Sequence, residues 1–531
     1  NLPFLGGNFF TGFILISLPI AFWGLYKNDK IKKDIFYGLA LAIFLAILSL
    51  ETEKEVLVIL GFILLLLFTF IFVFRPAKKF DLQKIASKTI LVITVAYLLF
   101  YSIGVVKDKK IIVNRLQLIS ERTLRSNPDF FNKKNHWEGE IEIIKKYPFG
   151  TGLGTFDLIY PQYKKDVLSF DKNSYSYFLQ AFTEVGILGF LAFLWFILIL
   201  VWRGFKLLSF GSRKENFWVP VILVSIVGSV FYNLISSNFS FLPNLAVFLI
   251  FSGIILSGYN NLAKKDREVI YTIKNRMIFL ILAFLLLILG VWQVYPNVNF
   301  DLGEEVEDYN FKEAKPKYEE SIRFNPNPYY LAKLAEINYY LRGHDDNLNR
   351  AYKLAERSIN LTPYNSLSYI VLGRLDVASG NTKRAVENFK KAIALDPLEE
   401  INGYIYLTDI YFKEGEYKEI EETLNLVLPK YSKEIIEKRI EMESLNLEVF
   451  HLKTRIAGLY NSLGLSLLYE NQPVSAEESF KRAIELNPKN PNSRYYLGVA
   501  LVKQGRVSEG EKEKSDVLEA FGDYKPPYEI K

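Results

Sequence analysis

Long apolar runs alternate with short polar connections over residues 1–296, and each run is long enough to cross a bilayer. A bilayer core is about 30 Å thick and takes a helix of roughly 20 mostly apolar residues. Runs such as 56–74 are too uniformly apolar for the buried helices of a soluble domain. The pattern predicts an all-α, polytopic transmembrane bundle with about eight spans, at residues 7–26, 34–50, 56–74, 89–106, 178–202, 217–235, 241–258 and 277–295.

The connections between these runs differ in their content of Lys and Arg. Residues 75–88 carry five such residues, whereas residues 236–240 carry none, and this alternation continues along the whole half. Short loops rich in Lys and Arg stay on the cytoplasmic side. We therefore predict a multi-pass protein of the cytoplasmic membrane, with loop 107–177 and residues 297–531 on the extracytoplasmic side.

Amphipathic, repetitive segments fill the second half of the chain. Small, aromatic and proline landmarks recur there with identical spacing, as Ala385, Phe389, Ala392 and Pro397 and again as Ala476, Phe480, Ala483 and Pro488. Small residues let two antiparallel helices approach, the aromatic residue fills the space between repeats, and proline closes the second helix. The spacing resembles the tetratricopeptide repeat. It predicts a soluble α-solenoid of five to six repeats over 297–522, with an irregular insertion around 429–455.

A stacked array of this kind offers an extended groove. We expect the groove to bind a protein or peptide, and the alternative is a rigid extension without a specific ligand. The domain prediction is therefore a transmembrane domain at 1–296, which includes the external loop 107–177, followed by an extracytoplasmic repeat domain at 297–531.

Charge and composition narrow the function. Residues 1–296 have a net charge of +13 and residues 297–531 of −7, so the overall +6 reflects basic membrane loops and gives no reason to expect a nucleic-acid partner. Zero cysteines exclude disulfides and a cysteine nucleophile, and three histidines disfavour a multi-histidine metal centre. There is no Walker-type glycine loop, so we expect neither ATP nor any other cofactor or metal. The chain begins with Asn1 almost directly in an apolar run, and we expect it to lack N-terminal residues.

The loop 107–177 holds a distinctive order of residues. His136-Trp137 is followed by a glycine loop at 147–156, with Gly150, Gly152 and Gly154, and then by Glu184-Val185-Gly186 at the entry of a span. This order, together with the opening Pro3-Phe4-Leu5-Gly6-Gly7, resembles the O-antigen ligase and O-antigen polymerase family over roughly residues 1–258. The glycines suit either a tight turn that folds the loop back or direct contact with substrate, while Gly186 and Gly189 favour close helix packing.

The resemblance implies transfer of a glycan from an undecaprenyl-pyrophosphate carrier to an acceptor on the outer face of the membrane. Fixed cations would stabilise the pyrophosphate leaving group, and a base near the acceptor hydroxyl would accelerate transfer by about 10²–10⁴-fold. In the frame set by Glu184 and Gly186, the histidine of the family falls on Tyr175, and two arginines of the family appear as Lys54 and Lys133. The candidate catalytic residues are Lys54, Arg122, Lys133, His136 and Tyr175, and the candidate substrate-binding residues are Arg115, Arg125, Trp137, Gly150, Gly152, Gly154 and Glu184.

Three functional hypotheses remain open at this point. The first is a membrane ligase or polymerase of a lipid-linked glycan, in which the repeats bind an acceptor or a protein partner. The second is a non-catalytic, membrane-anchored repeat scaffold of a cell-envelope assembly complex, which the loss of two arginines and the histidine favours. The third, an export or flippase-like component, is disfavoured because the predicted spans lack a charged lining.

Overall fold

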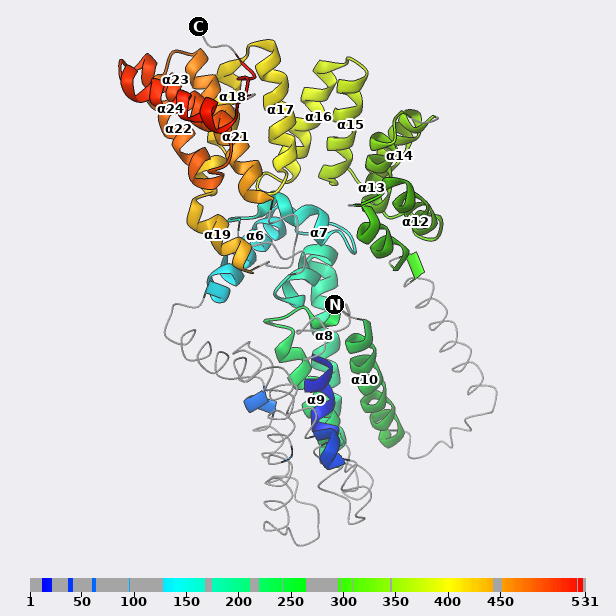
Figure 1. The fold of residues 1–531 in the computed structure, drawn as a ribbon. Helices are drawn as coiled ribbons and strands as arrows, with labels where there is room; N and C mark the ends of the chain where they lie inside the picture. Colours follow the sequence, from blue (N-terminus) through cyan, green and yellow to red (C-terminus); the bar gives the residue numbers. More distant parts are fainter. Residues whose placement is uncertain are drawn as a thin grey trace. The chain divides into compact units, whose positions relative to one another are not determined.

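The structure is a computed structural model, and it describes residues 12–21, 37–41, 60–63, 95, 128–167, 174–210, 219–240, 242–263, 295–296, 298–307, 309–343, 346–442, 451–522 and 524–528. Every regular element in these residues is a helix, which confirms the all-α prediction (Figure 1). The chain divides into two compact units. The first is Asn1–Asp157 with Asp171–Ile270, and the second is Leu158–Phe170 with Tyr271–Lys531. The sequence predicts that the whole loop 107–177 belongs to the membrane half, whereas in the structure Leu158–Phe170 belongs to the second unit.

The first unit contains one helix, among the described residues, that is long and apolar enough to cross a membrane. This helix spans Tyr177–Ser209 and contains an 18-residue window with a mean hydropathy of 2.7, and shorter apolar helices cover Gly12–Ala21, Val219–Tyr232 and Asn244–Tyr259. Most residues of the other predicted spans lie outside the described residues, so the number of eight spans remains a prediction. The elements of this unit that are described from end to end are α6 (Pro128–Lys146), α7 (Phe156–Ile159, which ends in the second unit), α8 (Tyr177–Phe210), α9 (Val219–Tyr232), η3 (Asn238–Ser240) and α10 (Leu242–Ala263).

Apolar side chains cover both the inner and the outer faces of α8. Leu200 and Leu207 are fully buried in a cluster with residues of α9 and α10. On other faces of the same helix, Leu188, Trp195 and Leu198 are each about two thirds exposed or more. A helix that is apolar all round, with a large exposed apolar face, is typical of a membrane span.

The second unit is a series of helix pairs (Figure 1). Its described elements are η2 (Tyr160–Tyr163), α12 (Phe311–Phe324), α13 (Pro328–Tyr340), α14 (Asn347–Leu361), α15 (Ser366–Ala378), α16 (Thr382–Leu395), α17 (Ile401–Glu414), α18 (Tyr417–Asn425), η4 (Leu428–Lys430), α19 (Lys433–Met442), α21 (Leu452–Tyr469), α22 (Pro473–Leu486), α23 (Pro491–Lys503) and α24 (Val507–Ala520). Consecutive helices pack in pairs from α13/α14 to α23/α24. The irregular insertion that the sequence predicts around 429–455 corresponds to η4 and α19. These two elements lie in sequence between the pair α17/α18 and the pair α21/α22.

The landmark residues of the repeats do what their spacing predicts. Phe389 and Phe480 are fully buried, and each ring lies against a glycine of the preceding helix. A Cβ atom on Gly373 would come within 2.5 Å of the Phe389 ring, and one on Gly464 within 2.6 Å of the Phe480 ring. The absence of a side chain at these glycines therefore creates the space that the aromatic ring fills.

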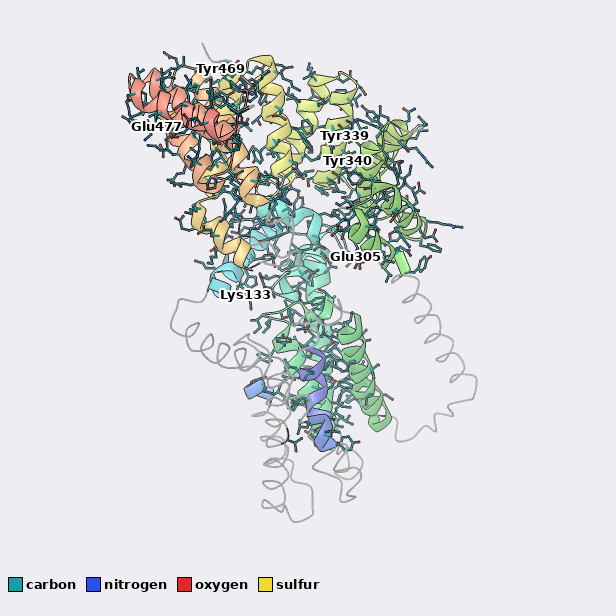
Figure 2. All side chains as sticks on the ribbon, viewed as in Figure 1. Lys133, Glu305, Tyr339, Tyr340, Tyr469 and Glu477 are labelled. Atoms are coloured by element: carbon teal, nitrogen blue, oxygen red, sulfur yellow. The ribbon has the colours of Figure 1, made fainter. Side chains whose placement is uncertain are left out.

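A buried carboxylate joins the last two helix pairs. Glu477, labelled in Figure 2, accepts hydrogen bonds from Gln504 Nε2 at 2.8 Å and Arg506 Nη1 at 3.0 Å, and pairs with Lys481 at 2.7 Å. Burial alone would raise its pKa, but these three donors outweigh burial and lower the pKa to about 2. The ionised side chain is thus held by donors from α22 and from the α23–α24 turn.

Replacing Glu477 with glutamine is expected to loosen α22–α24 at neutral pH, because charge-assisted hydrogen bonds become neutral ones. A depressed pKa contributes stability above the unfolded value, near 4.3, and that stability is lost as the pH falls toward about 2. Amide hydrogen exchange of peptides from α22–α24 measures the difference, which should shrink as the pH approaches about 3. Glu519→Gln, at an exposed position of α24, is the control and should behave like the unmodified chain.

Candidate functional site

One face of α6 gathers three ionisable side chains. Lys133, His136 and Glu140 lie three and four residues apart, so they share one side of the helix. Lys133, labelled in Figure 2, is 5% exposed, and the other two are fully buried. Charged groups are rarely buried without a specific partner, so this face of α6 is a candidate site.

His136 and Glu140 form a pair along the helix. His136 Nε2 lies 3.3 Å from Glu140 Oε1. Burial raises the pKa of Glu140 to about 8, although a hydrogen bond with Ser174 acts in the opposite direction. Ser174 Oγ in turn donates to the carbonyl of Ser176 at 2.8 Å and accepts from its N–H at 2.9 Å. The turn that starts α8 therefore places a hydroxyl near the carboxyl.

Tyr175 in that turn completes the cluster. Its ring lies edge-on to the imidazole of His136 with centroids 5.0 Å apart. Lys133 Nζ lies 5.5 Å from the centroid of the same ring. The structure thus brings together Lys133 and Tyr175, which lie far apart in sequence and which the resemblance predicts to match an arginine and the histidine of the family. It also places the imidazole of His136 directly beside Tyr175.

The glycine loop is fastened to a kink in α8. Thr151 N donates to Thr183 O at 2.9 Å, Gly152 N to Glu184 O at 3.0 Å, and Ile187 N to Pro148 O at 2.9 Å. The carbonyls of Thr183 and Glu184 are available because the helix breaks at Gly186, where φ is 69° and ψ is −175°. The loop therefore satisfies backbone groups that the kink leaves open.

Glycine is required on both sides of this contact. A Cβ atom on Gly150 would lie 2.5 Å from Glu184 O, and one on Gly186 would lie 2.2 Å from the carbonyl carbon of Phe149. Both residues also have positive φ, which other residues adopt only with strain. For Gly150 the turn interpretation accounts for the residue. For Gly186 the sequence favours helix packing, whereas the structure assigns it to the kink and the loop contact.

The remaining predicted site residues separate into two groups. Trp137 is half-buried on α6, Gly152 and Gly154 lie in the loop, and the Glu184 side chain accepts a hydrogen bond from Gln180 at 3.4 Å. Four predicted cations lie outside the described residues: Lys54, Arg115, Arg122 and Arg125. Sequence reasoning missed Glu140, although its position four residues after His136 on a helix was a usable signal.

The repeats carry a second cluster, on the first helices of successive pairs. The Arg374 guanidinium of α15 lies 4.1 Å from the ring centroid of Tyr339 and 4.6 Å from that of Tyr340, both on α13 and labelled in Figure 2. It also pairs with Glu336 at 3.1 Å. Tyr340 remains 41% exposed, so an aromatic edge is left for a partner.

Comparison with known proteins supports both resemblances. Residues 11–194 match the family described as O-antigen ligase, residues 367–397 match the tetratricopeptide repeat, and residues 475–505 match a further model of that repeat. A tetratricopeptide-repeat-containing protein of Methanocaldococcus jannaschii is 24% identical over 203 residues, which cover 33% of this chain and 35% of that protein. This chain thus spans about a third of the length of that relative.

Solved structures of repeat proteins are also similar to this chain. PilF of Pseudomonas aeruginosa matches with 18% identity and a TM-score of 0.28, over 37% of this chain and 78% of PilF. The C-terminal part of a repeat-containing protein from Cytophaga hutchinsonii matches with 17% identity and a TM-score of 0.30, over 42% of this chain and 80% of that one.

Proposed function

We propose that this protein transfers a glycan from an undecaprenyl-pyrophosphate carrier to an acceptor hydroxyl, at the outer face of the cytoplasmic membrane. The observation that carries the proposal is the buried cluster of Lys133, His136, Glu140 and Tyr175, within a segment that matches O-antigen ligases. The membrane part would cross the bilayer about eight times, with the cluster in the external loop 107–177.

The reaction needs a base, and His136 fits that role. The acceptor oxygen bonds to the anomeric carbon, while the bond from that carbon to the pyrophosphate breaks and its electron pair stays on the leaving oxygen. The hydroxyl proton passes to the imidazole of His136, and Glu140 stabilises the imidazolium that forms. Tyr175 at the histidine position is a poor base near neutral pH, because a phenol has a pKa of about 10.

Lys133 supplies positive charge to the same site. Its ammonium would face the pyrophosphate as negative charge builds on the leaving oxygen. A lysine gives a point charge in place of the bidentate contact of an arginine. We therefore expect Lys133 to bind the phosphates more weakly than an arginine would, but still to stabilise their negative charge. No metal is needed for this step, since the donor is already activated.

Gene deletion followed by profiling of lipid-linked and surface glycans tests the proposal. Accumulation of long carrier-linked chains would identify a ligase, and accumulation of single carrier-linked units would identify a polymerase. Unchanged profiles would contradict transfer and favour the alternative, a membrane-anchored repeat scaffold. The chain contains no cysteine, so a single cysteine in place of Leu153, which is 80% exposed in the same loop, also reports topology. Labelling of this cysteine in intact cells supports the external position of the loop.

The rate of transfer is expected to rise with pH up to about 8. The raised pKa of Glu140 keeps its carboxyl mostly protonated at neutral pH, and only the ionised form stabilises a positively charged imidazole. Each unit of pH below that value should lower the rate by up to about tenfold. Transfer rates in isolated membranes between about pH 6 and pH 9 measure this dependence. A Glu140→Gln variant should lack the part of the increase that comes from ionisation of Glu140. An unmodified chain with a flat profile would contradict the role of Glu140.

The repeats are proposed to bind a protein partner or the acceptor. Tyr340 supports this, because it is 41% exposed and is held in place by the buried Arg374 guanidinium, and tyrosine is enriched at contact surfaces. Arg374→Met would remove the guanidinium while keeping an unbranched apolar side chain of comparable length. Loss of a co-purifying partner in that variant, with transfer to a soluble acceptor retained, would locate the binding surface.

A further inference from the structure

Part of the external loop is built into the repeat unit. Residues Leu158–Phe170 lie in sequence between two stretches of the first unit, yet they belong to the same compact unit as the repeats. The short helix η2 packs against α16. Val167 is 2% exposed and lies in the main apolar cluster of the repeats. The loop segment is thus part of the core of the second unit.

An ion-pair network holds the same segment. Lys164 Nζ bonds to Glu399 Oε1, in the turn between α16 and α17, and the lysine side chain is 6% exposed. On the other side, Arg439 of α19 lies 3.4 Å from Glu399 Oε2 and donates to the carbonyl of Val167 at 3.2 Å. Glu399 is therefore held between a cation from the loop and a cation from the insertion.

The turn at 396–400 carries several acidic side chains that Lys164 helps to neutralise. The turn holds three carboxyls within five residues, those of Asp396, Glu399 and Glu400. Burial raises the pKa of Asp396 to about 6 and that of Glu400 to about 8. Burial would also raise the pKa of Glu399, but Lys164 and Arg439 outweigh it and lower that pKa. Buried charges need paired partners, and one of the two cations comes from outside the repeats in sequence.

We propose that the turn at 396–400 and helix α19 form a docking site whose occupant is residues 160–167 of the same chain. The irregular insertion between two repeats contributes to this site, because its helix α19 supplies Arg439, which contacts both Glu399 and Val167. In sequence, the docked segment lies between the glycine loop and the Ser174–Ser176 turn. The array therefore restrains the loop between the two stretches that carry the candidate site, and Glu399 is a positioning residue.

Amide hydrogen exchange of the full-length chain in detergent tests the docking. Glu399→Gln and Lys164→Met should each raise the exchange of peptides covering 158–167 by about tenfold to a hundredfold, because each removes a charge-assisted contact. The double variant should exceed Glu399→Gln by little, since the bond that Lys164→Met removes is one that Glu399→Gln has already weakened. Glu387→Gln, at an exposed position of α16, is the matched control and should leave exchange unchanged.

The outcomes separate docking from misfolding and from the proposed function. Peptides of α23 and α24 must stay protected in the variants, which shows that the repeats remain folded. Unchanged exchange of 158–167 in both Glu399→Gln and Lys164→Met would overturn the docking. The positioning role rests on the proposed function and predicts a lower kcat with an unchanged KM for the carrier-linked donor in Glu399→Gln. Looser docking with an unchanged kcat would overturn positioning, whereas absence of transfer in the unmodified chain would overturn the proposed function alone.

Discussion

Replacing His136 with alanine is expected to lower glycan transfer by about 10²–10⁴-fold, which is the usual contribution of a positioned general base. The imidazole is fully buried, pairs with Glu140 at 3.3 Å and lies against Tyr175. Glu140→Gln should give a smaller loss, because the imidazole remains but its conjugate acid is no longer stabilised. Transfer of labelled carrier-linked glycan in membranes, normalised to the amount of folded protein, measures both.

Two controls and one competing result define this prediction. Glu142→Gln, on an exposed position of the same helix, and His451→Ala, exposed in the repeats, should retain transfer. His136→Gln fills more of the cavity than alanine and guards against a loss caused by collapse of the site. Tyr175→Phe should retain most activity. If instead Tyr175→Phe abolishes transfer while His136→Gln is active, the tyrosine at the position of the family histidine is the base.

The second large effect is expected from Gly186→Ala. At φ 69° and ψ −175° the backbone lies in a region that is essentially restricted to glycine, and holding a residue with a Cβ atom there costs about 1–3 kcal/mol. The new methyl group would also lie 2.2 Å from the carbonyl carbon of Phe149, which is backbone and cannot move aside alone. The loop must separate from the kink, so the bonds from Thr151 to Thr183 and from Ile187 to Pro148 should break together.

Exchange of peptides covering 147–156 measures this separation, and transfer should fall with it because the loop adjoins the candidate site in sequence. Gly253→Ala is the matched control. Gly253 lies on the apolar helix α10, and a methyl group added there would meet no neighbouring side chain within 4 Å, so alanine should be neutral or slightly stabilising. A Gly186→Ala chain with wild-type loop protection would show that the kink tolerates a side chain.

Regular patterns made most of the fold predictable. The repeated Ala, Phe and Pro landmarks located the helix pairs, and Phe389 and Phe480 fill the spaces that Gly373 and Gly464 leave. This succeeded because helix pairing in such arrays is local, so spacing along the chain translates directly into packing. The count of eight spans stays a prediction, because most of those runs lie outside the described residues.

The candidate site was predictable only in part. The family frame pointed to Lys133 and Tyr175, and His136 was noticed as a loop histidine, but their contact was not foreseeable. Glu140 was missed because a glutamate on a polar helix usually faces solvent, and only burial reveals its partner. The sequence favours helix packing for Gly186, because glycine in an apolar helix suits that role. In the structure, the need for glycine at this position comes from the close backbone contact with Phe149 in the distant loop.

By itself, the sequence determined the helical class, the repeats, the apolar character of the first half and the loop that carries the family pattern, because each depends on local periodicity or composition. The tertiary structure decided which charges meet. Lys133 and Tyr175 come together with His136 and Glu140 in one cluster, and Lys164 joins Glu399 across more than two hundred residues. Such pairings follow from how buried helices and turns approach one another in space, and that information is absent from spacing along the chain.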